Sequence, residues 1–136
     1  MQIEGMKHLT LILTLFFSTM FASPAYADWE RGASSMEGDV IYVDFDRIRT
    51  NGGYVYYWEL GDYLEPKSET LSVKTYNQGD CEMFRYRTLN ATFYKQPMGE
   101  GSGEIYSPPN PEWKYPAPNI RGEYILKLVC ELAENL

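Results

Sequence analysis

The sequence predicts an α+β fold: a small antiparallel β-sheet of about five or six strands in a meander, with a C-terminal α-helix packed on it and tethered by one disulfide. Three observations predict it. Short runs of β-branched and aromatic residues alternate with glycine- and asparagine-containing turns along most of the 136 residues. One segment near the C-terminus has apolar residues at helical spacing. The two cysteines, Cys81 and Cys130, fall in the predicted sheet and the predicted helix.

Residues 1–27 have the pattern of a secretory signal peptide. A basic residue precedes the apolar stretch of residues 9–17 (LTLILTLFF), and Ala25-Tyr26-Ala27 has the small-x-small pattern of a cleavage site. The apolar stretch is too short for a membrane span, which disfavours an uncleaved anchor. We therefore expect cleavage after Ala27 and a single mature domain over residues 28–136.

Two strands are predicted in the first half of the mature chain. Residues 28–39 are polar and form a lead-in with a turn near its end. Residues 40–44 (VIYVD) have the composition of a short strand. The turn sequence of residues 50–53 (TNGG) leads into residues 54–60 (YVYYWEL), which form the clearest strand of the chain.

The strand at residues 54–60 has two faces, because side chains alternate along a strand. One face carries Tyr54, Tyr56, Trp58 and Leu60, and the other carries Val55, Tyr57 and Glu59. Burying a lone carboxylate is costly. The face with Glu59 is therefore expected to point to solvent, and the other face to the core.

The second half of the mature chain continues the alternation of strands and turns. The predicted elements are a polar loop at 61–69 interrupted by Pro66, a strand at 71–76, a turn at 77–80, one long strand or two strands joined by a bulge at 81–94, a loop at 95–103, a short strand at 104–107 and an extended proline-rich connection at 108–118.

The C-terminal segment is the predicted helix, which spans residues 120–132 after the capping residue Asn119. The apolar side chains that share one helical face are Ile125, Leu128, Val129 and Leu132. Cys130 lies on this helix and Cys81 at the start of the long strand, so a disulfide between them would join the helix to the sheet. In the chain-entropy model, such a bridge stabilises the fold by about 4 kcal/mol.

Charge and composition exclude several kinds of function. The formal net charge of −7 disfavours nucleic acids and anionic membrane surfaces as partners. The one histidine, His8, lies in the predicted signal peptide. The mature chain therefore lacks the imidazole that Ser-His-Asp catalysis, Cys-His catalysis and histidine metal sites require. We expect no catalytic residues, no cofactor, no metal and no membrane span after signal cleavage.

Four carboxylates lie close together in the sequence, at Glu59, Asp62, Glu65 and Glu69. A pair of them could serve a hydrolase as acid and base, or several could bind calcium. They lack EF-hand spacing, and charged loop residues are normally solvated. A solvated acidic loop is the favoured interpretation, and a carboxylate-based hydrolase is a remote alternative.

Tyrosines and two arginines are the candidates for a protein-binding surface. Tyr57 and Tyr76 are expected to face outward, and tyrosine combines a wide contact area with a polar tip. The alternative is that these tyrosines only reflect strand propensity. Arg85 and Arg87 share one face of their strand, where they would either hold an anionic partner or pair across the sheet with Glu59 or another carboxylate.

A series of short motifs runs through nearly the whole mature chain. They are residues 40–44 with Ile48 and Arg49, residues 58–60 with Asp62 and Tyr63, Cys81, residues 85–87, Tyr94, residues 97–101, Trp113, Pro116, Gly122, Val129 and Cys130. In this order and spacing, the motifs resemble the surface-adhesin protein E family of Gram-negative bacteria.

The resemblance implies a small antiparallel sheet with a C-terminal helix held by a disulfide, in agreement with the prediction from the residues. It also implies an exported protein related to a lipoprotein that binds host matrix and serum proteins and haem. Here Asp28, and not a cysteine, follows the cleavage site, so anchoring by a lipid is not expected. A haem would find only tyrosine, methionine or cysteine ligands in the mature chain.

The predicted function is that of an exported, non-enzymatic, adhesin-like module, periplasmic or secreted to the cell surface. It would contact other proteins through a tyrosine-rich sheet face. The expected partner is a host matrix or serum protein or a bacterial envelope protein, and a homodimer is compatible with the same surface. The alternative is a structural or accessory periplasmic envelope protein with no separable ligand.

Overall fold

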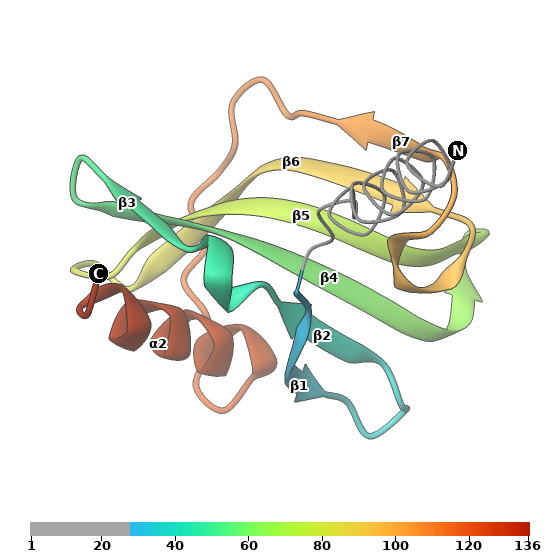
Figure 1. Cartoon of the computed structure of the whole chain (residues 1–136), viewed down its shortest axis with the longest axis horizontal. Coiled ribbons are helices and arrows are strands. Elements are labelled where there is room, and N and C mark those ends of the chain that lie inside the picture. Colours follow the sequence, from blue (N-terminus) through green and yellow to red (C-terminus); the bar gives the residue numbers. More distant parts are fainter. Residues whose placement is uncertain (1–27) are drawn as a thin grey trace, which may run out of the picture.

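The computed structural model describes residues 28–136, so the predicted signal peptide lies outside the described residues. Its strands form one antiparallel sheet in the order β1-β2-β4-β5-β6-β7, and β3 pairs with β4 (Figure 1). The elements are β1 (Glu30–Ser34), β2 (Val40–Val43), η1 (Phe45–Arg47), β3 (Arg49–Asn51), β4 (Tyr54–Lys67), β5 (Thr70–Asp80), β6 (Arg85–Tyr94), η2 (Pro97–Gly99), β7 (Gly103–Tyr106) and α2 (Arg121–Ala133).

The sheet is a meander with one C-terminal helix, which confirms the predicted fold class. It has seven strands and not five or six, because the predicted lead-in contains β1 and the stretch before the Gly52-Gly53 turn forms β3. β1 pairs with β2, with Arg31 opposite Tyr42. Gly52 and Gly53 have φ values of +62° and +84°, a conformation that glycine adopts readily and that closes the tight turn into β4.

The two longest strands, β4 and β5, form a hairpin that extends further than predicted. β4 continues through the expected loop to Lys67, and β5 continues through the expected turn to Asp80. Both predictions were wrong because paired neighbours outweigh local turn propensity. Pro66 is tolerated because the β4–β5 register shifts between Asp62 and Lys67, where ladder hydrogen bonds are not needed. Cys81 lies in the turn before β6 and not at the start of a strand.

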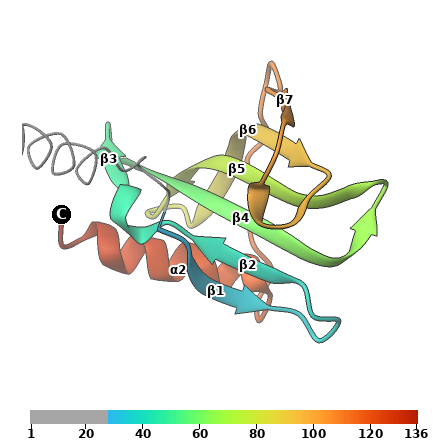
Figure 2. The ribbon, with the colours of Figure 1, turned by 45° about the vertical axis from the view of Figure 1, so that its right-hand side comes forward.

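The core lies between α2 and one face of the sheet. Ile125 and Val129 of α2 pack with Val43, Val55 and Tyr57, all of which are at most 2% exposed. Figure 2 shows α2 running along the side of the sheet that β1, β2 and β4 form.

Close approach of the helix requires a small residue in β5. An added Cβ at Gly79 would lie 2.8 Å from Cγ1 of Val55 and 3.1 Å from Cδ1 of Leu126. The predicted disulfide is confirmed: Cys81 and Cys130 are bonded, with Cα atoms 5.8 Å apart and a sequence separation of 49.

The predicted inward and outward faces of β4 are reversed. Val55 and Tyr57 are buried beneath α2, whereas Tyr54, Tyr56 and Trp58 lie on the opposite face and are only partly buried. Glu59 shares the helix side of the strand. It avoids complete burial because it lines a cavity at the N-terminal end of α2. Leu60 is buried, as predicted, but on the side of the sheet where η2 packs.

The helix itself begins one residue later than predicted. Ile120 occupies the N-cap position, and Asn119 has a φ of +64°, so the prediction of Asn119 as the cap was wrong. Leu126 is buried although the predicted face omitted it, and Leu132 is exposed although that face included it. Among the residues that the structure describes, no helix is long and apolar enough to span a membrane.

Candidate functional site

The sheet face opposite α2 carries a continuous group of aromatic and arginine side chains. We call it the aromatic face and define it as Tyr54, Tyr56, Trp58, Tyr76, Arg85, Arg87 and Trp113. Six of these residues come from β4, β5 and β6, where Trp58 lies opposite Tyr76 and Gln78 lies between Tyr56 and Arg87. All seven are partly buried, so each one is packed on one side and open on another.

Trp113 joins this face from outside the sheet. It belongs to the proline-rich connection between β7 and α2, in which the structure has no helix or named strand. The neighbouring Lys114 pairs with Tyr86 of β6 through two backbone hydrogen bonds, of 3.0 and 2.8 Å. These bonds fix the connection beside β6 and place the Trp113 ring over the arginines.

Aromatic rings and guanidinium groups stack along the face. The ring of Tyr76 lies 4.7 Å from that of Trp58 and 6.0 Å from that of Tyr56, measured between centroids. The guanidinium carbons of Arg85 and Arg87 lie 4.3 and 4.4 Å from the Trp113 centroid, within cation–π range. Tyr54 stacks on the same indole at 5.8 Å. The side chains are therefore held in place before any partner arrives.

Hydrogen bonds fix the two arginines further. Nε of Arg87 donates to the amide oxygen of Gln78 at 2.6 Å, and the amide nitrogen of Gln78 donates to the hydroxyl of Tyr56 at 3.0 Å. Nε of Arg85 donates to Asp80 at 3.0 Å. This hydrogen bond raises the pKa of Arg85. The pKa of Asp80 is lowered, mainly by the hydrogen bond from the backbone N–H of Met83 and to a smaller extent by Arg85.

Basic groups gather on this face of an otherwise acidic protein. Arg47 lies 5.4 Å from the Trp58 ring and forms an ion pair with Asp44, which is 1% exposed. Lys74 lies 5.2 Å from the Tyr94 ring. The local charge is thus less negative than the net charge of −7 suggests.

The structure brings together three of the four predicted site residues. Tyr76, Arg85 and Arg87 lie on the aromatic face. Tyr57 does not: it is 1% exposed and part of the core, so the prediction that it faces outward was wrong. Of the two alternatives for the arginines, Arg85 makes the cross-strand ion pair, with Asp80 and not with Glu59.

Sequence reasoning missed part of the site. Tyr54, Tyr56 and Trp58 were assigned to the core because the face of Glu59 was assigned to solvent. Trp113 was named only among the family motifs and not as a site residue, although a tryptophan in a connection with five prolines is unusual enough to signal an anchoring contact.

The four clustered carboxylates separate in space. Glu59 lines a cavity beside α2, and Asp62 accepts a hydrogen bond from the backbone N–H of Met98 at 2.8 Å. Glu65 and Glu69 are exposed and line different cavities. Within residues 28–136, no group of three or more potential metal ligands comes together. The four carboxylates therefore do not form one cluster.

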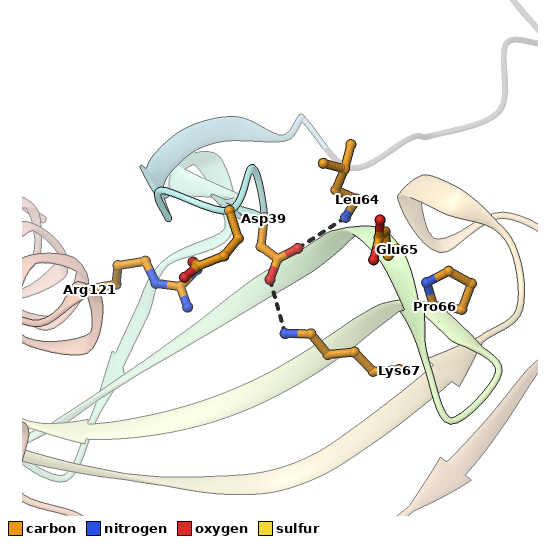
Figure 3. A pocket seen from close by; sticks show the side chains of 7 residues that line it. Asp39, Leu64, Glu65, Pro66, Lys67 and Arg121 are labelled. Carbon is orange, nitrogen blue, oxygen red and sulfur yellow. Dashed lines mark hydrogen bonds and ion pairs between the residues drawn. The ribbon is translucent and has the colours of Figure 1, made fainter.

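One of these cavities, of about 480 Å³, lies between the β1–β2 turn and the end of β4 (Figure 3). Asp39 accepts hydrogen bonds from the backbone N–H of Leu64 and from Nζ of Lys67, both at 3.0 Å. Both contacts lower the pKa of Asp39, and the hydrogen bond from Leu64 has the larger effect. Arg121 reaches the same cavity from α2. The ion pair of Asp39 with Lys67 thus connects the β1–β2 turn to the end of β4.

The family comparison and the structural comparison both find similarity to protein E. The model of the family described as surface-adhesin protein E matches residues 29–131. No curated protein matches the chain in sequence. Among solved structures, crystal form II of protein E from Haemophilus influenzae has 17% identity and a TM-score of 0.57, covering 79% of this chain and 91% of that one.

Two further solved structures are similar. Another structure of Haemophilus influenzae protein E has 14% identity and a TM-score of 0.57, covering 83% of this chain and 91% of that one. Protein E from non-typeable Haemophilus influenzae has 16% identity and a TM-score of 0.52, covering 84% and 93%. At these identities, the structures establish a common fold.

Proposed function

The chain belongs to the surface-adhesin protein E family, and from this premise we propose that it binds another protein through the aromatic face. Because the family is one of surface adhesins and not of enzymes, the chain is an exported, adhesin-like, non-enzymatic protein. We further propose that cleavage after Ala27 releases a mature domain of residues 28–136 that is not anchored through an N-terminal cysteine.

The single observation that carries the proposal is the composition and order of the aromatic face. Tyrosine, tryptophan and arginine are the residues enriched in protein interfaces and in their energetic hot spots. Here they are partly exposed and already stacked on one another. Binding would therefore immobilise few additional side chains, which lowers the entropic cost of association.

The proposed partner is a host matrix or serum protein, or a protein of the bacterial envelope. A second copy of the chain is the remaining candidate for the same face.

Photo-crosslinking tests the proposal directly. A photo-reactive phenylalanine replaces Tyr76 on the aromatic face or, as a matched control, Tyr124, which is 55% exposed on α2. Each protein is irradiated with extracellular-matrix proteins, with envelope extract, and alone. We expect adducts from position 76 that excess wild-type protein suppresses, and none from position 124. No adduct from position 76 in any arm would contradict the proposal and favour a structural envelope protein with no separable ligand.

A further inference from the structure

A second candidate site lies on the other side of the sheet, where α2 begins. A cavity of about 250 Å³ opens between the N-terminal turn of α2 and strands β2, β4 and β6. We call it the Glu59 pocket. Its lining residues are Ile41, Tyr57, Glu59, Tyr86, Ile120, Arg121, Gly122 and Ile125. This volume is below the range of about 300–1,000 Å³ for drug-sized ligands, so the pocket fits a small molecule or one side chain.

Glu59 is the unusual member of this lining. It is partly buried, and loss of hydration alone raises its pKa from 4.5 to about 7. No hydrogen bond or neighbouring cation among the described residues offsets that effect. A carboxyl group in such a place is normally paired, because an isolated buried charge is costly.

Two tyrosines, Tyr57 and Tyr86, line the same pocket as this carboxyl. The pKa of Tyr57 is raised first by burial and then by the charge of Glu59, and the pKa of Tyr86 is raised in the same way. Both phenols therefore lie within electrostatic reach of the carboxylate. The pocket is thus lined by three oxygen-bearing side chains from β4 and β6. It is also lined by the apolar side chains of Ile41, Ile120 and Ile125.

The charged groups at the start of α2 act on a cation in the pocket in both directions. Arg121 also lines the pocket, but none of the ion pairs within residues 28–136 joins it to Glu59. The positive end of the helix dipole opposes a cation here. The carboxylate of Glu123, in the first turn of α2, acts in the opposite direction while it accepts a hydrogen bond from the backbone N–H of Asn119.

We propose that the Glu59 pocket binds an aliphatic primary ammonium group, from a small free amine or from a lysine side chain of a partner protein. An ammonium has three N–H donors, and the carboxylate of Glu59 and the hydroxyls of Tyr57 and Tyr86 are three acceptors. The isoleucine side chains suit the alkyl stem. The site is separate from the aromatic face, so this proposal stands independently of the proposed function.

Calorimetric titration of the protein with n-butylammonium and with Nα-acetyl-lysine amide tests the proposal, with n-butanol as the uncharged control. We expect the ammonium compounds to bind and butanol not to bind. Affinity should fall about tenfold between pH 8 and pH 6, because a carboxyl with a pKa near 7 is mostly ionised at the first pH and mostly protonated at the second. Tighter binding of n-butylammonium than of Nα-acetyl-lysine amide indicates a free amine, and tighter binding of the lysine probe indicates a partner lysine.

Three variants make the result specific to the pocket. Glu59→Gln removes the charge, and Gly122→Ala adds a Cβ 3.9 Å from the Tyr86 hydroxyl without a close contact; both should lower affinity at least tenfold. Glu65→Gln, which removes an exposed carboxylate elsewhere, is the matched control and should bind as the wild type does. The proposal is overturned if neither ammonium probe binds, if acetate binds in their place, or if Glu59→Gln leaves the affinity unchanged.

Discussion

At the scale of single residues, Glu59 makes the stability of the helix side of the sheet depend on pH. Its pKa of about 7 in the folded protein lies above the ordinary value of 4.5, because burial penalises the charged form. Folding therefore favours the protonated carboxyl. Its cost to stability is absent below about pH 4.5, grows as the pH rises, and is complete above about pH 7.

Replacing Glu59 with glutamine should consequently stabilise the protein in a pH-dependent manner. The amide keeps the shape of the side chain and removes its charge. We expect Glu59→Gln to raise the free energy of unfolding by on the order of 2 kcal/mol at pH 8 and to leave it nearly unchanged at pH 4. Urea unfolding at both pH values measures this difference. A variant equally destabilised at both would show that the carboxylate is paired in the folded protein.

Glu59 also explains why the sequence assigned the faces of β4 wrongly. The rule that a lone carboxylate faces water is sound for a uniformly covered sheet. Here α2 covers Val55 and Tyr57, but its N-terminus lies beside Glu59. The same face of β4 is therefore buried at Val55 and Tyr57 and open to a cavity at Glu59. Alternation along a single strand carries no information about where a distant helix ends.

At the scale of elements, the contact between α2 and the sheet depends on Gly79 of β5. Its backbone lies so close to Val55 and Leu126 that a side chain has no room. The Cys81–Cys130 disulfide closes the same contact from the other end of the helix. Bridging residues 49 apart stabilises a fold by about 4 kcal/mol in the chain-entropy model, a large share of the total for a domain of this size.

Two glycine-to-alanine variants test this helix–sheet contact. Gly79→Ala places a Cβ 2.8 Å from a methyl group of Val55, and we expect it to lower the free energy of unfolding by about 1–3 kcal/mol. Gly122→Ala, in α2, meets only atoms 3.7 Å or more away and should be neutral or slightly stabilising. Thermal unfolding of both proteins compares them. Equal stability of the two variants would contradict the account of the packing.

The elements also show which signals in the sequence are strong. The C-terminal helix was predictable from its apolar periodicity, and the strand at residues 40–44 from its composition. The disulfide was predictable because the mature chain has two cysteines. β1 was not, because Glu30–Ser34 is polar and becomes a strand through pairing with β2. The position of Trp113 could not be predicted either, because it depends on the pairing of Lys114, in the proline-rich connection, with Tyr86 of β6.

At the scale of the whole molecule, the sheet has two faces with different roles. One is covered by α2 over an apolar core and opens to solvent at the Glu59 pocket. The other is covered in part by η1, η2 and the connection that carries Trp113, and between them it presents stacked aromatic and arginine side chains. A protein that is acidic overall thus presents a locally basic, aromatic surface, which is the composition expected of a protein interface.

The affinity of the partner captured by crosslinking at position 76 is the measurement that tests the role of this face most directly. It compares wild-type protein with Trp113→Ala and with Tyr124→Ala, after thermal unfolding has shown that all three are folded. We predict that Trp113→Ala weakens binding at least about tenfold, because the indole holds both arginines in place, and that Tyr124→Ala leaves it unchanged. Equal affinity of all three proteins would contradict the assignment of the aromatic face as the binding surface.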